Sequence, residues 1–324
     1  YFLKNYQSCQ DMYCFCWELL LIQKMVQQGP PVDIQKASIL LHAQKARLFY
    51  IPLNLDLTHR RTLPQTHIET ADELKKQTLT EQNNSLSKMN ILITGASKGI
   101  GFATAKMLAD QGHQVVGLAR TKPNNFPGAF HTIDLGCETA RITLFNQLAS
   151  EHKFDGLLNN VGLVNPAPIE DITLEHFDAC IDINLRCSLQ AAQAVVPHMK
   201  DKGHGRIVFT SSMVVAGVPF RTSYAASKSG MVSFTRSWAL ELATHGITVN
   251  SVAPGPVETE LFNTNNPKGS ESRARYIEGI PMQRVGLPRE IAAANCYFLV
   301  GQSGFTTGQT LFVDGGYMTG KSAL

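Results

Sequence analysis

The sequence predicts an α/β protein built on a doubly wound parallel sheet. From Met89 onward, short apolar runs of strand length alternate with longer segments of helical periodicity. A glycine-rich turn joins the first apolar run, 91–94, to the first helical segment. Because strands that alternate with helices pair in parallel through right-handed crossovers, this rhythm favours one sheet with helices on both faces.

Strands and helices are expected at regular intervals from this point to the C-terminus. The expected strands are 91–94, 114–119, 130–133, 156–159, 206–210, 247–252 and 310–313. The expected helices run from the glycine turn to about Gln111 and then over 138–150, 174–199, 224–244 and 288–300. The strand runs are rich in Ile, Leu and Val without polar alternation, which is typical of strands buried on both faces.

Residues 1–88 differ in character from the rest of the chain. They are rich in Gln, Leu and Thr, show no strand–helix alternation, and end in a polar linker at 82–87. We therefore expect 1–88 to be an extension that is disordered or not native, with 89–324 as a single domain. A regulatory or targeting extension is the alternative.

Composition limits the classes of protein that the chain can belong to. With 44% hydrophobic residues the chain can bury a large core, and a net charge of +3 is too small to indicate binding to nucleic acid. No apolar run is long enough to predict a membrane span. The seven cysteines are odd in number and lack zinc-ligand spacing, so we expect free thiols in a reducing cytoplasm and no metal site.

The turn after the first strand has the spacing Gly95-x-x-x-Gly99-x-Gly101. Glycines at such a turn let the backbone approach a pyrophosphate, and the following helix N-terminus supplies N–H donors and a positive dipole. The turn therefore predicts a dinucleotide site. A plain strand–helix turn is the alternative.

The residues that would meet the adenosine ribose favour NADP(H) over NAD(H). The second strand ends in Ala119, which offers no carboxylate to a ribose hydroxyl, and Arg120 follows it. Lys98 lies within the glycine turn, so two cations are available for a 2′-phosphate. Asp134, at the end of the third strand, is expected either to accept a hydrogen bond from the adenine amino group or to cap the next helix.

Tyr224 and Lys228 are four residues apart in an expected helix, so their side chains lie on one face. An ammonium beside a phenol stabilises the phenolate and is expected to lower the pKa of the tyrosine. Ser212 comes shortly before, at the end of a strand, and can hold the oxygen that gains or loses a proton. This arrangement predicts proton transfer to or from a carbonyl or alcohol oxygen.

Together with these residues, several segments resemble the short-chain dehydrogenase/reductase superfamily. The match runs from about Met89 to Tyr317, with Val161 in place of an alanine usual in the family. In that family the serine usually lies about thirteen residues before the tyrosine. Counted back from Tyr224, this separation selects Ser211, but the strand register favours Ser212. The matching segments are 94–101, 159–162, 183–185, 254–259 and 308–316, together with the single residues Ser212, Tyr224 and Lys228.

The resemblance implies a Rossmann-type fold and a set of residue roles. Tyr224 would be the general acid/base, Lys228 would hold the nicotinamide ribose, and Ser212 would orient the substrate oxygen. Asn184 would support a water-linked proton relay through Lys228, and Thr259 would bond the nicotinamide carboxamide. The implied cofactor-binding residues are Gly95, Ser97, Lys98, Gly99, Ile100, Gly101, Arg120, Asp134, Leu135, Asn160, Val161, Gly162, Tyr224, Lys228, Pro254, Gly255, Val257 and Thr259.

The segments Tyr-Ala-Ala-Ser-Lys and Gly-Ile-Thr-Val-Asn are similar to those of 3-oxoacyl-(acyl-carrier-protein) reductases. Gly203 and His245 stand where those enzymes carry arginines that dock the acidic carrier, so carrier docking would need other arginines, among them Arg186, Arg206 and Arg221. The variable segment 261–283 combines apolar side chains with Arg273, Arg275 and, just beyond it, Arg284. It predicts an apolar substrate pocket with a basic rim, or alternatively an exposed loop with a few core anchors.

The resulting hypothesis is an NADP(H)-dependent oxidoreductase that interconverts a carbonyl and a secondary alcohol, with 3-oxoacyl thioesters among the indicated substrates. A non-catalytic dinucleotide sensor or scaffold is the alternative. We also expect a homotetramer or homodimer, because Met231, Phe234, Trp238 and Leu242 give one helix more apolar residues than a single sheet face needs. The other interpretation is that all of them face the sheet.

A chain that starts at Met89 should fold and keep its activity, because the strand–helix rhythm and the family resemblance both begin there. Circular dichroism and turnover of a generic ketone with NADPH would check this. Loss of folded protein on removing 1–88 would mean that the extension packs on the domain.

Overall fold

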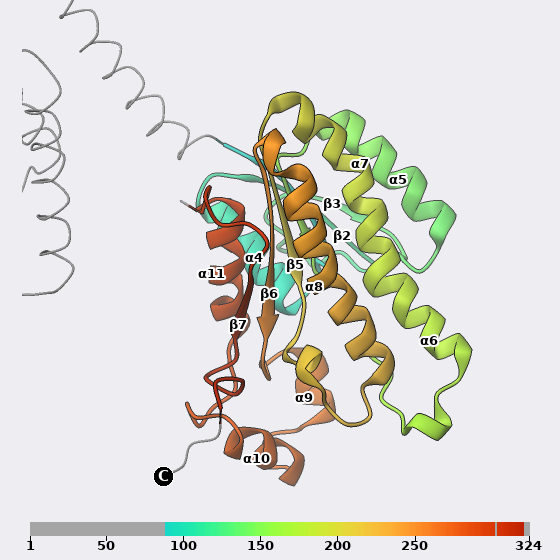
Figure 1. Cartoon of the computed structure of the whole chain (residues 1–324), viewed down its shortest axis with the longest axis vertical. Coiled ribbons are helices and arrows are strands. Elements are labelled where there is room, and N and C mark those ends of the chain that lie inside the picture. Colours follow the sequence, from blue (N-terminus) through green and yellow to red (C-terminus); the bar gives the residue numbers. More distant parts are fainter. Residues whose placement is uncertain (1–87, 302, 321–324) are drawn as a thin grey trace, which may run out of the picture. The chain divides into compact units, whose positions relative to one another are not determined.

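The structure is a computed structural model that describes residues 88–301 and 303–320 (Figure 1). The expected N-terminal extension lies almost entirely outside these residues and stays a prediction. In the described part, seven strands form one sheet in the order β3-β2-β1-β4-β5-β6-β7, and every neighbouring pair is parallel. The strands are β1 (Asn90–Thr94), β2 (Gln114–Ala119), β3 (Ala129–Thr132), β4 (Gly156–Asn159), β5 (Gly205–Thr210), β6 (Ile247–Pro254) and β7 (Thr310–Val313).

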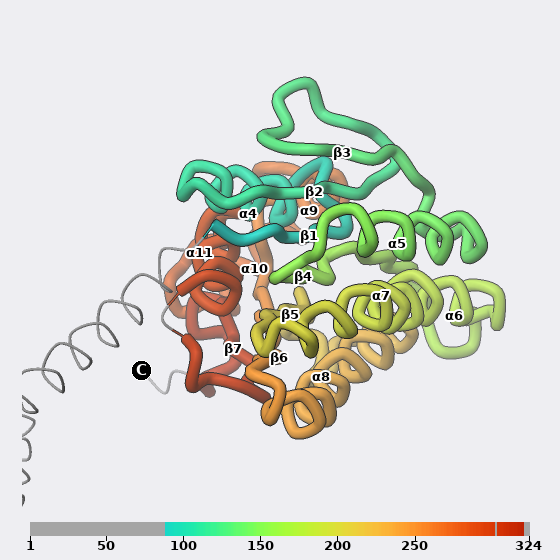
Figure 2. Tube along the Cα trace, turned by 90° about the horizontal axis from the view of Figure 1, so that it is seen from above, coloured from blue at the N-terminus to red at the C-terminus, as the bar shows by residue number. Residues whose placement is uncertain are grey.

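Helices cover both faces of the sheet, as Figure 2 shows from above. On one face lie α4 (Gly99–Asp110) and α11 (Pro288–Leu299), and on the other lie α5 (Glu138–His152), α7 (Cys187–Lys202) and α8 (Thr222–Leu242). The predicted doubly wound α/β fold is therefore confirmed. The strand order reverses direction between β1 and β4, which is the point where such sheets place their ligands.

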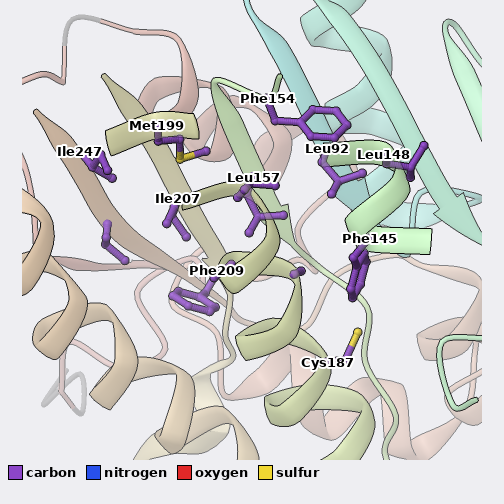
Figure 3. Close-up of a cluster of buried hydrophobic side chains, with 14 of the residues drawn as sticks. Leu92, Phe145, Leu148, Phe154, Leu157, Cys187, Met199, Ile207, Phe209 and Ile247 are labelled. Atoms are coloured by element: carbon purple, nitrogen blue, oxygen red, sulfur yellow. The ribbon is translucent and has the colours of Figure 1, made fainter. Parts of the chain in front are cut away.

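The core follows from the strands being buried on both faces. Along β1, Ile91 and Ile93 face the layer of α4 and α11, whereas Leu92 faces the layer of α5 and α7. Figure 3 shows the second layer, where Leu157 and Phe209 of the sheet lie opposite the helices. Because each fully buried side chain of this size contributes about 1.5–3 kcal/mol, these two layers supply most of the drive to fold.

The helix expected over 174–199 is interrupted. The chain forms α6 (Leu174–Ile181), a π-helical segment η2 (Asp182–Arg186) and then α7, which ends at Gly203 with φ +66°. A single π turn widens the helix and re-aims the residues within it. Here it contains Asn184, whose side chain is completely buried.

A buried ion pair holds the π segment against α5. Arg141 is fully buried and binds both carboxylate oxygens of Asp182 at 2.5 and 2.7 Å. Its guanidinium also donates to the Leu135 carbonyl at 2.8 Å. The hydrogen bond from Arg141 lowers the pKa of Asp182, so the pair stays ionised at neutral pH.

The apolar residues of α8 pack on the protein's own core. Met231 and Leu242 are buried, and the rings of Phe234 and Trp238 stack at 4.7 Å beside Phe209. The excess of apolar residues that suggested a subunit interface is thus largely used within one chain. The homo-oligomer stays a prediction.

Candidate active site

Two cavities of about 330 and 810 Å³ adjoin one another at the carboxyl ends of the strands. Both are lined by Lys98, Asn160, Gly162, Leu163 and Glu260. The smaller cavity is also lined by the expected site residues Gly99, Ile100, Ser212, Tyr224, Lys228, Pro254, Gly255, Val257 and Thr259. The larger is also lined by Gly95, Ser97, Arg120, Asp134, Leu135 and Val161. Only Gly101 and Asn184, among the expected site residues, line neither.

The glycine turn is held in a form that only glycine allows. Gly95 has φ +67°, and a Cβ on Gly101 would lie 2.3 Å from the Gly95 carbonyl oxygen. The Asn160 amide donates to that same oxygen at 3.0 Å, and Thr94 Oγ1 accepts from the backbone N–H groups of Asn160 and Val161 at 3.0 and 3.1 Å. Asn160 therefore holds the turn in place from the neighbouring strand.

The turn fits a dinucleotide pyrophosphate. α4 begins at Gly99 directly beside the cavities, and no side chain caps its N-terminus, so its first backbone N–H groups have no side-chain partner. Close backbone packing of Gly95 and Gly101 keeps side-chain bulk away from that helix end. An uncapped helix N-terminus at the edge of a cavity is a site for a phosphate group.

Arg120 and Asp134, which the sequence predicts near an adenosine, both line the larger cavity. Arg120 is exposed at the wall of the larger cavity. Asp134 accepts from the Gly136 N–H at 2.9 Å and does not cap α5, whose N-cap residue is Cys137, so the capping interpretation is wrong. Lys98 is engaged in an ion pair with Glu260 at 2.7 Å, which joins the glycine turn to α9 (Glu260–Asn265).

Tyr224, Lys228 and Ser212 converge at the smaller cavity. Tyr224 lies in the first turn of α8, and the Lys228 ammonium is 5.6 Å from the centre of its ring. Lys228 is 2% exposed and donates to the Thr210 carbonyl at 2.7 Å. Ser212 lines the same cavity as Tyr224 and acts to lower the pKa of the phenol, whereas the Ser211 hydroxyl donates to the Lys228 carbonyl at 3.2 Å. The geometry thus favours Ser212, not Ser211, as the serine that faces the phenol.

The expected lowering of the Tyr224 pKa is wrong for this structure. Burial raises the pKa of Tyr224 to about 12, because the loss of hydration of a phenolate outweighs the hydrogen bond from Ser212 and the charge of Arg221. Burial also lowers the pKa of Lys228 to about 8. At neutral pH the site therefore holds a neutral phenol and a protonated amine.

Asn184 is placed behind the cavity. Its Oδ1 accepts from the Leu163 N–H at 2.7 Å, and its Nδ2 donates to the Leu163 carbonyl at 2.9 Å and to the Ser227 hydroxyl at 2.8 Å. The amide is thereby fully engaged with neighbouring protein groups. Asn184 ties the loop after β4 to α8 and holds that loop against the cavity.

The segment over the smaller cavity contains α9 and α10 (Glu271–Glu278). Phe262 and Tyr276 line the cavity with their rings 5.5 Å apart, while Thr259 caps α9 by accepting from the Phe262 N–H at 3.2 Å. The predicted basic rim is wrong, because Arg273, Arg275 and Arg284 do not line the cavity. Arg273 is buried and pairs with Glu258 at 3.2 Å, Arg275 pairs with Glu271 at 3.8 Å, and Arg284 pairs with Glu290 at 2.7 Å.

Some residues that shape the site were missed from the sequence. Leu163, Val164 and Glu260 line the cavities, and Ser227 accepts the hydrogen bond from Asn184. Ser227 lies between Tyr224 and Lys228 in the sequence, so its position was visible there. Glu260 gave no signal, because its contact with Lys98 joins segments that are far apart in the chain.

The described residues contain no group of three or more His, Cys, Asp or Glu side chains placed to hold a metal ion. Within the same ranges, 88–301 and 303–320, no helix is both long enough and apolar enough to cross a membrane.

Comparison with known proteins agrees with this geometry. A family model described as enoyl-(acyl carrier protein) reductase matches residues 95–318. The 3-oxoacyl-(acyl-carrier-protein) reductase FabG of Thermotoga maritima is 34% identical over 238 residues, which is 69% of this chain and 96% of that protein. The chain belongs to the short-chain dehydrogenase/reductase superfamily.

Solved structures give the same result. A candidate NAD(P)-dependent gluconate 5-dehydrogenase from Beutenbergia cavernae, with NADP bound at low occupancy, has a TM-score of 0.69 and 29% identity, covering 73% of this chain and 99% of its own. A candidate 2-deoxy-D-gluconate 3-dehydrogenase from Agrobacterium tumefaciens with bound NADP has a TM-score of 0.68, 29% identity and the same coverage. The FabG relative is a reductase and these structural relatives are named as dehydrogenases, so the chain is an oxidoreductase.

Lys228→Met should stabilise the cofactor-free protein by about 1–3 kcal/mol at pH 7, because a buried cation is replaced by an apolar side chain of similar length. The pKa of Lys228 falls from 10.5 to about 8 on folding, so its destabilising effect is complete below pH 8 and disappears as the pH rises towards 10.5. Urea denaturation at pH 7 and pH 10 would measure this.

The exposed Lys122→Met is the matched control and should change the free energy of unfolding little at either pH. An equal effect of Lys228→Met at both pH values would contradict the assignment of a destabilising buried charge.

Proposed function

We propose that this protein is an NADP(H)-dependent oxidoreductase that interconverts a carbonyl and a secondary alcohol, with Tyr224 as the general acid and base. The observation that carries the proposal is that Tyr224, Ser212 and Lys228 line one cavity, which adjoins the glycine turn, with the Lys228 ammonium 5.6 Å from the centre of the Tyr224 ring. A non-catalytic sensor would need the turn alone. The complete set of proton-transfer side chains favours an enzyme.

The residues of the two cavities suit a nicotinamide dinucleotide. The glycine turn and the N-terminus of α4 would hold the pyrophosphate, and Lys228 would hold the nicotinamide ribose. Pro254, Gly255, Val257 and Thr259 line the smaller cavity together with Tyr224, and the nicotinamide would lie beside them. When bound, the reduced cofactor supplies a hydride to the carbonyl carbon.

The side chains of the protein supply the proton and the orientation. The neutral Tyr224 phenol donates its proton to the carbonyl oxygen, which Ser212 holds by a hydrogen bond. As the phenolate forms, the Lys228 ammonium and the Arg221 guanidinium stabilise its charge. Asn184 acts as a positioning residue, because it holds Leu163 at the cavity wall and contacts no ligand space itself.

NADP(H) is favoured over NAD(H). Ala119 leaves the ribose end of the cavity without a carboxylate from β2, and the exposed Arg120 lies at the same wall. The NADP-bound structural relatives support the same choice. Lys98 is a weaker candidate for the 2′-phosphate than the sequence suggested, because Glu260 already neutralises its charge.

The FabG relatives make a 3-oxoacyl compound the first substrate class to test. Two of the arginines considered for carrier docking are engaged elsewhere. Arg186 pairs with Asp182 at 2.9 Å, and Arg206 donates to the carbonyls of Gly205 and Gly246 at 2.8 and 3.3 Å. Arg221, at the smaller cavity, remains. A homo-oligomer and a cytoplasmic location remain predictions.

Tyr224→Phe should abolish reduction, a loss of at least about a hundredfold in kcat, while NADPH still binds, because the phenyl ring has no proton to donate. Ser212→Ala should lower kcat and leave the cofactor affinity unchanged. Stopped-flow reduction of a 3-oxoacyl thioester with NADPH, together with fluorescence titration of NADPH, would separate these effects.

Ser211→Ala is the matched control, since it removes the neighbouring hydroxyl, which bonds only the Lys228 carbonyl. A larger loss from Ser211→Ala than from Ser212→Ala would reverse the choice of serine. Tyr224→Phe with most of its activity intact would end the proposal of Tyr224 as the acid.

Arg120→Ala should raise the KM for NADPH by about tenfold or more while changing the KM for NADH little, because a charged hydrogen bond contributes about 1.5–3 kcal/mol. The control is Lys122→Ala, which removes an exposed cation of the same loop that does not line the cavity. Equal effects of Arg120→Ala on both cofactors would refute the preference for NADP(H).

A further inference from the structure

We infer that Arg221 forms an anion subsite beside Tyr224, and that the substrate is a short oxo acid whose carboxylate binds there. The inference deepens the proposed function and rests on it, since it assumes that Tyr224 protonates the reacting carbonyl. It distinguishes a free 3-oxo acid from the thioester that the FabG relatives suggest.

The charges of the smaller cavity leave one cation for the substrate. Its charged lining residues are Lys98, Arg221, Lys228 and Glu260. Lys98 and Glu260 neutralise one another at 2.7 Å, and Lys228 is buried and donates to the Thr210 carbonyl. Within residues 88–301 and 303–320, no carboxylate lies within ion-pair distance of Arg221.

The backbone brings Arg221 to the cavity wall. Phe220 has φ +62°, an uncommon conformation for a bulky residue, and Arg221 is the N-cap residue of α8, one turn before Tyr224. The Phe220 carbonyl is held by the Ala167 N–H at 3.2 Å and by Arg221 Nη1 at 3.3 Å. This anchors one edge of the guanidinium. The described residues supply no other hydrogen-bond partner for it, so donors remain for a carboxylate.

The size of the cavity limits the substrate. Arg221, the N-cap residue of α8, and Tyr224, in the first turn of the same helix, both line the smaller cavity of about 330 Å³. A molecule that presents its carbonyl to Tyr224 and a carboxylate to Arg221 must therefore fit both groups into this one small cavity. In the reduction the carbonyl carbon gains a hydride, the oxygen gains the Tyr224 proton, and the carboxylate is unchanged.

The remaining walls agree with a small substrate that has one charged end. Val164, Pro166, Met213, Leu261 and Phe262 give the rest of the cavity an apolar lining. An arginine binds a carboxylate through two parallel hydrogen bonds, which a neutral thioester cannot accept in the same way. The cavity therefore distinguishes the acid from its neutral derivative at the Arg221 end.

The test compares 3-oxobutanoate with its methyl ester, which keeps the ketone and removes the charge. The wild-type chain should show a higher kcat/KM with NADPH for the acid. Arg221→Gln should lower the ratio of acid to ester by about 10- to 150-fold, which corresponds to one charged hydrogen-bonding interaction. Arg221→Lys should keep part of the ratio, because the charge remains while the paired hydrogen bonds are lost.

Arg236→Gln is the matched control: it makes the same charge change on an exposed position of α8, outside the smaller cavity, and should leave the ratio unchanged. A wild-type chain that reduces the ester as well as the acid overturns the subsite and leaves the proposed function intact. A chain that reduces neither, nor any other ketone, overturns the proposed function itself.

Two thioesters of the same acid test whether Arg221 binds the substrate carboxylate or a phosphate of the carrier. Acetoacetyl-coenzyme A carries phosphates, whereas the N-acetylcysteamine thioester carries neither a phosphate nor a carboxylate. If Arg221→Gln selectively impairs the coenzyme A thioester and not 3-oxobutanoate, the guanidinium binds a carrier phosphate and the oxo-acid assignment is wrong. Selective impairment of the free acid supports it.

Discussion

The burial of the Lys228 ammonium is the constraint on which the rest of the site depends. The amine is 2% exposed and donates to the Thr210 carbonyl at the end of β5. This bond fastens α8 to the carboxyl end of the sheet. Because Tyr224 lies one turn earlier on the same helix, its ring is fixed against the cavity by the same contact. A charge that is costly to bury therefore positions the proton donor.

The loops at this edge of the sheet are held mostly by polar side chains. Asn160 binds the glycine turn, Asn184 binds the backbone of Leu163 in both directions, and Arg141 binds the π segment and Leu135. Each of these side chains is buried or half-buried and joins two segments that are distant in sequence. Loops that carry ligand-binding residues are thereby fixed to the rigid sheet without needing regular secondary structure.

The electrostatics of the site suit a proton donor more than a base in the absence of ligand. Burial keeps the phenol protonated, and the charge of the Arg221 guanidinium opposes this effect by favouring the phenolate. A positive charge beside the phenol stabilises the phenolate, which develops as the proton is transferred during reduction, more than it stabilises the neutral phenol of the resting enzyme. The one carboxylate of the smaller cavity, Glu260, is neutralised by Lys98, so the cavity presents a net positive surface to its substrate.

The sequence by itself determined the doubly wound sheet, the glycine turn and the helix that carries Tyr224 and Lys228. These features depend on periodicity and on spacing between near neighbours, which a sequence displays directly. Only the tertiary structure decided that Asn184 lies in a π turn, that Arg273 is buried while Arg221 reaches the cavity, and that the pKa of Tyr224 rises. These features depend on contacts between distant segments and on the loss of hydration that such contacts cause. The spacing of residues along the chain shows neither the contacts nor the loss of hydration.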